Sequence, residues 1–282
     1  MIIDFHTHTF PDHISQQVVH KLSLESHTLP FTDGSLHGLL TSMHHSGVDY
    51  SVTLPVMTNI GQVEKINSSI KENKDSLLTQ GIIAFGGMHP DYENYKEELK
   101  QLHLSGVKGI KLHPAYQNVD LDDIRMMRII DAASELGLII LIHAGIDIGL
   151  YHHNYSSVPH ILKVLHEVKP QKLVLAHMGN WGCWEEVESD LAGADVYLDT
   201  AFAIGSVTPA PYVNEPPLLS SNLSNRDFVR IVKKHGVGKI LFATDSPWED
   251  QTDYIRRMEE MPLSREEKIK ILGENAASLL QL

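Results

Sequence analysis

Eight short apolar segments, spread along the whole chain, constrain the fold more than any other feature. They cover residues 2–8, 48–56, 81–87, 107–113, 138–143, 172–177, 195–199 and 239–245. The segments are rich in β-branched residues and nearly continuous in apolar character. This pattern is typical of strands that are buried on both faces of a parallel sheet. We therefore expect eight parallel strands.

Stretches with the apolar spacing of amphipathic helices separate these segments. Clear examples are residues 122–136, 158–168 and 226–236. A Ser-x-x-Glu pattern, Ser264 to Glu267, is typical of the capping box that begins a helix. Eight strand–helix units predict an α/β fold, a (β/α)8 TIM barrel that forms one domain over residues 1–282. An open doubly wound sheet is the alternative, but no Gly-rich phosphate-binding motif follows an early strand.

Two connections are longer than the others, and both follow the C-terminal end of a predicted strand. The connection after the first strand covers residues 9–47, and the connection after the seventh covers residues 200–225. In a (β/α)8 barrel, the loops that follow the strands surround the mouth of the active site. We expect these two long loops to cover the site or select the substrate. The alternative is that either one is an ordinary surface loop.

Charge and composition exclude several classes of partner. The formal net charge of −13 gives no electrostatic basis for binding nucleic acid or an anionic membrane. No apolar segment approaches the length of a membrane span, and the N-terminus lacks the pattern of a secretory signal. The single cysteine, Cys183, fits a reducing compartment. We expect a cytoplasmic protein with a small-molecule substrate. A homodimer is common among such barrels, although no sequence pattern specifies one.

Ionisable side chains gather at the predicted C-terminal ends of the strands. They are His6 and His8 on the first strand, Lys111 and His113 on the fourth, His143 on the fifth, His177 on the sixth and Asp245 on the eighth. A barrel brings these ends to one mouth. The two-residue period of a strand directs His6 with His8, and Lys111 with His113, to the same face. Unpaired polar groups buried there would be costly, whereas a metal ion would satisfy several of them.

Imidazole and carboxylate ligands suit Zn²⁺ or a similar ion, at distances of about 2.0–2.2 Å. Three histidines and one aspartate would leave room for a water, whose pKa falls from about 15.7 to about 7 on binding. A nearby carboxylate could take its remaining proton. Each residue also has a structural alternative. A lone histidine at a strand end is often only hydrogen-bonded, and Asp245 could cap a helix. Lys111 could itself be the cation that contacts substrate or supports the structure. The position of the whole set at strand ends favours a metal site.

At these residues the chain resembles the amidohydrolase superfamily, specifically the amidohydrolase-2 branch of metal-dependent hydrolases. The similar stretches, in order along the chain, are IIDFHTHTF, GVKGIKLHPAYQ, LGLIILIHAG, LVLAHMGN, DVYLDTAF, ILFATDSPWED and ILGENAASLL. The resemblance implies a (β/α)8 barrel with a metal at its mouth and His6, His8, His143 and Asp245 as ligands. It also implies that Asp245 accepts the proton of metal-bound water. His177 would be a catalytic acid/base that contacts substrate, or a ligand of a second metal.

The number of metal ions, one or two, stays open at this point. Superfamily members with two metals usually bridge them by a carboxylated lysine or a glutamate on strand four, where this chain has Lys111 followed by His113. Both residues would contact either substrate or a second metal, and carboxylation of Lys111 is open. The expected ion is Zn²⁺, with Mn²⁺ or another divalent metal as alternatives. Asp4, two residues before His6, is expected to hold an imidazole in one tautomer from outside the ligand set.

The expected activity is hydrolysis of a C–N or C–O bond in a small amide, lactone or ester by metal-activated water. A non-oxidative decarboxylase or hydratase on the same metal site is the first alternative, because the branch includes such lyases. A TatD-like deoxyribonuclease is the second, suggested by GGMHP and TDSPW. The acidic charge and the lack of a strand-four glutamate disfavour the nuclease. A barrel that only binds ligands is disfavoured by the near-complete ligand set. The loops contain no clear arginine clamp, so the sequence does not identify the substrate.

Overall fold

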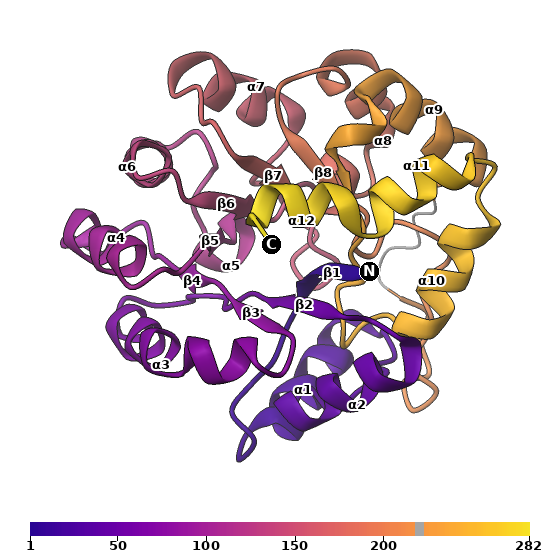
Figure 1. Ribbon diagram of the computed structural model, residues 1–282, viewed down its shortest axis with the longest axis horizontal. Coiled ribbons are helices and arrows are strands. Elements are labelled where there is room, and N and C mark those ends of the chain that lie inside the picture. The colour runs from indigo at the N-terminus through magenta and orange to yellow at the C-terminus, as the bar shows by residue number, and fades with distance from the viewer. Residues whose placement is uncertain (218–222) are drawn as a thin grey trace.

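Parallel strands form the centre of the molecule and helices surround them (Figure 1). The computed structural model describes residues 1–217 and 223–282. The strands are β1 (Ile3–Thr7), β2 (Tyr50–Thr53), β3 (Ile82–Ala84), β4 (Gly86–Gly87), β5 (Gly109–Leu112), β6 (Ile139–Ile142), β7 (Leu173–Leu175), β8 (Tyr197–Asp199) and β9 (Ile240–Leu241). They pair in parallel in the order β1-β2-β3 and β4-β5-β6-β7-β8-β9. Each strand lies within one of the predicted segments.

The two strand groups close into one barrel. β3 and β4 are halves of a single barrel strand, separated only by Phe85. Backbone hydrogen bonds from Phe5 N to Phe242 O (2.9 Å) and from Asp245 N to His6 O (2.8 Å) join β1 to the chain after β9. The fold is therefore the predicted (β/α)8 TIM barrel, with the third predicted strand broken in two.

The helices that alternate with the strands lie mainly on the outside of the barrel (Figure 1). They are α1 (Ser15–Ser26), α2 (Leu36–Ser46), α3 (Gly61–Leu78), α4 (Tyr95–Leu104), α5 (Pro114–Gln117), α6 (Ile124–Glu135), α7 (Val158–Glu167), α8 (Trp184–Glu186), α9 (Asn225–His235), α10 (Gln251–Glu260), α11 (Arg265–Ile269) and α12 (Asn275–Leu280). The predicted capping box is present, because Ser264 and Glu267 cap α11 reciprocally. None of the helices in the described part of the chain is both long and apolar enough to cross a bilayer.

The barrel interior is apolar along most of its length. Ile3, Phe5, Leu141 and Leu241 are among its fully buried residues. Helix α12 lies across the end of the barrel where the chain begins, and it contributes side chains to the same apolar cluster (Figure 1). This end is therefore closed, and the polar side chains gather at the opposite end, where strands of a (β/α)8 barrel carry their sites.

The two long connections differ from each other in structure. Residues 9–47, predicted as a long loop, contain α1 and α2. Within residues 200–225, positions 218–222 lie outside the described residues. The two connections touch: Leu29 N donates to Thr208 O (2.9 Å) and Ala210 N donates to His27 O (3.0 Å). A role as lid or substrate-selecting loops stays a prediction.

Candidate metal centre

Three potential ligand atoms form a triangle at the C-terminal ends of two neighbouring strands, β1 and β9. His6 Nε2 lies 3.1 Å from His8 Nε2, and Asp245 Oδ1 lies 3.1 Å from His8 Nε2 and 3.4 Å from His6 Nε2. Two ligands about 2.1 Å from a tetrahedral ion stand about 3.4 Å apart. The triangle therefore fits a divalent ion. It contains three of the four expected ligands.

Both histidines of this triangle are held with Nε2 toward the ion position. His6 Nδ1 lies 2.9 Å from Asp199 Oδ2, and His8 Nδ1 lies 2.8 Å from the carbonyl oxygen of Leu54. Because both partners accept hydrogen bonds, each Nδ1 carries the proton and each Nε2 keeps its lone pair. Burial lowers the pKa of His6 well below its usual range, which favours the neutral imidazole that binds metals.

The expectation that Asp4 holds an imidazole is wrong, because a β-bulge changes the phase of β1. Asp4 pairs with Ser51, but Thr7 pairs with Thr53, so β1 contains one extra residue between these pairs. Asp4 therefore does not share a face with His6. Its side chain accepts from Thr244 Oγ1 (2.6 Å) and from Gln251 Nε2 (2.8 Å), and its contact with His6 is to the backbone N–H. Bulges of this kind are common next to active sites.

Asp199 has the role that was expected for Asp4, because its carboxylate contacts the imidazole of His6. It is fully buried at the end of β8; its Oδ2 faces His6, while Oδ1 accepts from the backbone N–H groups of His177 (2.9 Å) and Ala201 (3.0 Å). Burial raises the pKa of Asp199 to about 7, against the effect of these hydrogen bonds and of Lys111. Sequence reasoning did not assign this residue. Its place at the end of the seventh predicted strand is the signal that could have found it.

His143, the fourth expected ligand, lies beside His177. His143 Nδ1 is 3.0 Å from His177 Nε2, and His177 Nδ1 donates to the carbonyl oxygen of Ala201 (2.8 Å). Burial lowers the pKa of His177 to about 4 and that of His143 well below its usual range, so both rings are neutral. His143 Nε2 is buried without a hydrogen-bond partner among the described residues. Such an orphaned lone pair suits a metal ligand.

Lys111 lies inside the barrel next to the triangle. Its register partner is Leu141, an interior residue, and its Nζ is 3.2 Å from His6 Nε2. Burial lowers the pKa of Lys111 to about 8, while Asp199 and Asp245 favour its charged form. Some neutral amine is therefore present near pH 8, and this is the form that carboxylation requires. The position suits equally a cation that faces a substrate carboxylate.

His113 belongs to a neighbouring group with Asp147, a residue that sequence reasoning did not single out. His113 precedes α5, and its Nδ1 accepts the backbone N–H of Tyr116 (3.4 Å). Its ring is stacked on that of His143, with centroids 4.1 Å apart. His113 Nε2 is 3.7 Å from Asp147 Oδ2. Asp147 lies in the loop after β6, and no strand-end pattern marks it.

Backbone strain coincides with the two expected catalytic residues. Asp245 has φ of 70° and His177 has φ of 58°. Non-glycine residues rarely adopt this left-handed conformation, and they cluster at functional sites when they do. The backbone at both positions is therefore held in a conformation that non-glycine residues usually avoid.

Gly145 fixes how the loop after His143 packs against the loop after His177. Its φ is 97°, and a Cβ atom there would lie 2.0 Å from Trp181 N. We expect Gly145→Ala to lower the free energy of unfolding by roughly 3–5 kcal/mol, through backbone strain and this clash. Urea unfolding measures it. Gly137→Ala is the matched control, because Gly137 has φ of 70° with nothing within 4 Å of its Cβ position; equal losses in both variants would contradict the packing argument.

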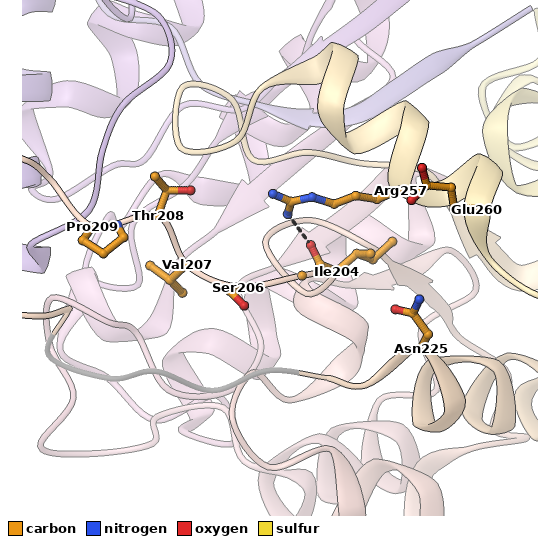
Figure 2. A pocket seen from close by; sticks show the side chains of 9 residues that line it. Ile204, Ser206, Val207, Thr208, Pro209, Asn225, Arg257 and Glu260 are labelled. Carbon is orange, nitrogen blue, oxygen red and sulfur yellow. Dashed lines mark hydrogen bonds between the residues drawn. The ribbon is translucent and has the colours of Figure 1, made fainter.

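Arg257 ties the loop after β8 to the loop that carries Asp245. Its Nη1 donates to Ile204 O (2.7 Å) and lies 3.3 Å from Glu249 Oε2. Figure 2 shows this hydrogen bond beside a cavity of about 420 Å³. Burial raises the pKa of Glu249 to about 8, and Arg257 opposes this shift. Through these two contacts, Arg257 links the loop after β8 to the loop after β9.

The comparisons with known proteins agree with this fold. A family model described as Amidohydrolase matches residues 3–282. Among solved structures, 5-carboxyvanillate decarboxylase from Sphingomonas paucimobilis is 14% identical with a TM-score of 0.68, covering 100% of this chain and 99% of that chain. Dihydroxybenzoic acid decarboxylase from Polaromonas, with bound manganese and the inhibitor 2-nitroresorcinol, is 14% identical with a TM-score of 0.69, covering 100% and 97%.

An uncharacterised TIM-barrel protein from Bordetella bronchiseptica is 16% identical with a TM-score of 0.71, covering 99% of this chain and 98% of that chain. A search of the curated proteins finds no match. The structural likenesses, at such low identity, support the barrel fold, and the family model covers nearly the whole chain. The chain belongs to the amidohydrolase family of metal-dependent TIM-barrel proteins.

Proposed function

We propose that this protein is a metal-dependent lyase that removes CO₂, without an oxidant, from a small hydroxylated aromatic acid. The observation that carries the proposal is the triangle of His6, His8 and Asp245 beside a buried cation, Lys111. The full-length likeness to decarboxylases, one of them with bound manganese, supports the lyase over the hydrolase. We propose further that residues 1–282 act as one domain, and that His143 completes the ligand set.

In such a reaction the bond between the ring carbon and the carboxylate breaks, and its electron pair stays on the ring carbon, which then takes a proton. A bound divalent ion would supply Lewis acidity at a substrate oxygen. Asp199 and the Leu54 carbonyl hold His6 and His8 with Nε2 toward the ion position. Lys111 faces the substrate carboxylate. Asp245 delivers the proton, which it takes up from solvent, and His177 contacts the substrate beside it.

A hydrolase is the second candidate, because the position of Lys111 suits a carboxylated lysine as well as a cation. Lys111 Nζ lies against His6 in the interior of the barrel, and His143, beside His177, offers a further ring nitrogen, Nε2, that has no hydrogen-bond partner among the described residues. A carboxylated Lys111 would add oxygen ligands between these two groups. Two ions, with Asp245 accepting a proton from activated water, would then suit the cleavage of an amide, lactone or ester.

Removal of the metal and a paired substrate panel test the proposal. We expect a chelator to abolish turnover and Mn²⁺ or Zn²⁺ to restore it, because ligand atoms alone cannot polarise the substrate. With metal restored, hydroxybenzoates should release CO₂, while esters, lactones and amides should stay intact. The metal content per chain, measured by elemental analysis, should be one. Hydrolysis without CO₂ release, together with two ions per chain, would establish the second candidate instead.

A further inference from the structure

We infer that His113 and Asp147 form a subsite that binds a neutral hydroxyl group of the substrate, next to the expected ligand His143. The inference rests on the proposed function for the location of the substrate, and it adds a specificity-determining pair to it. Both residues are nearly buried, with exposed fractions of 6% and 9%. The pair is therefore largely shielded from solvent.

The hydrogen bond at the start of α5 fixes the tautomer of His113. His113 Nδ1 accepts the backbone N–H of Tyr116, so this nitrogen carries no proton. The proton of a neutral imidazole must then lie on Nε2. His113 Nε2 is a hydrogen-bond donor, and it faces Asp147.

Asp147 supplies the matching acceptor. Its Oδ1 accepts the backbone N–H of Gly149 (2.9 Å), which holds the carboxylate in place and leaves Oδ2 toward His113. The 3.7 Å between His113 Nε2 and Asp147 Oδ2 is too long for a direct hydrogen bond. A hydroxyl oxygen about 2.8 Å from each atom would accept from His113 and donate to Asp147. A carboxylate could accept but not donate, so this pair selects a hydroxyl.

The same geometry disfavours a metal ion at this pair. A histidine binds metals through a lone pair in the plane of its ring. The rings of His113 and His143 are stacked, with an interplanar angle of 16°, so their in-plane lone pairs run side by side and do not converge. One nitrogen of His113 caps α5 and the other is protonated. The group formed with Asp147 is therefore a polar subsite beside the metal centre.

Equilibrium binding to the Mn²⁺-loaded protein tests the inference without requiring turnover. The probes are benzoate and its 2-, 3- and 4-hydroxy derivatives in calorimetry, and phenol against anisole in ligand-observed NMR. Wild-type protein should bind at least one hydroxybenzoate about tenfold more tightly than benzoate, and phenol in preference to anisole, because two hydrogen bonds are gained. Asp147→Asn and His113→Asn should reduce that preference to about twofold or less, with the affinity for benzoate unchanged. Asparagine at position 113 can still cap α5.

Asp195→Asn is the matched control, because the Asp195 side chain is 90% exposed and pairs with Lys239 at the surface. It should keep the wild-type preference. A hydroxyl preference that survives in both site variants, or the loss of one metal ion per chain in Asp147→Asn, would overturn the subsite. If no benzoate binds but phenol still distinguishes the variants, the proposed substrate class fails and the subsite stands. If benzoates bind and release CO₂ without any hydroxyl preference, the subsite fails and the proposed function stands.

Discussion

Asp245→Asn is expected to lower kcat by about 10³-fold or more while the barrel stays folded. Asp245 Oδ1 forms two sides of the ligand triangle with His6 and His8. A neutral amide is a weaker ligand and cannot carry the transferred proton, and the loss of general acid–base catalysis alone costs about 10²–10⁴-fold. The position also has φ of 70°, and asparagine tolerates the left-handed region better than most residues. We therefore expect the variant to lose activity and not to unfold.

Steady-state kinetics at saturating metal measure this effect, with circular dichroism and thermal unfolding as checks on the fold. Asp195→Asn again serves as the exposed control and should keep full activity. The expectation holds for both candidate reactions, because Asp245 delivers the proton in one and accepts it in the other. Activity within tenfold of wild type in folded, metal-loaded Asp245→Asn would show that another group moves the proton.

The alternation of strands and helices could be predicted because each element has a recognisable pattern in its own stretch of sequence. Buried parallel strands need short apolar runs, and helices need apolar residues at helical spacing, so the barrel could be inferred from patterns along the chain. The capping box at Ser264 and Glu267 was also visible for this reason. The break of the third predicted strand at Phe85 was not, because it lies where the strand changes its pairing partner: β3 pairs with β2, and β4 pairs with β5.

Contacts that depend on pairing could not be inferred in the same way. The bulge in β1 exists only relative to β2, and it moves Asp4 away from the imidazole that the two-residue period assigned to it. Asp147 comes to His113 through the path of a loop, which no period describes. The end of a strand would have marked Asp199, but its partner, His6, is 193 residues away.

The ligand residues by themselves do not decide between lyase and hydrolase. Both reactions begin with a polarised substrate oxygen and need a carboxylate that moves a proton, so both require His6, His8 and Asp245 in the same places. The differences lie in the state of Lys111 and in the groups that surround the substrate. These depend on buried geometry, which is why the reaction class rests on measurement of products and metal content.

Asp199→Asn should weaken metal binding by about 10–100-fold and leave the protein folded. In the wild type, Asp199 Oδ2 accepts the proton of His6 Nδ1, while Oδ1 accepts two backbone N–H groups. Asparagine can keep its oxygen on the backbone groups, but its amide then donates toward His6 Nδ1. His6 Nδ1 must accept, the ring proton moves to Nε2, and that nitrogen can no longer bind the ion.

Competition with a chromophoric chelator measures the metal affinity, and nitrogen chemical shifts of the imidazoles report the tautomer of His6. Asp4→Asn is the matched control: Asp4 is equally buried, but its side chain contacts Thr244 and Gln251 rather than an imidazole. That variant should lose stability and keep its affinity for metal. If Asp4→Asn weakened metal binding as much as Asp199→Asn, general loosening of the barrel would explain both losses. A selective loss in Asp199→Asn would assign the orientation of His6 to a single buried carboxylate.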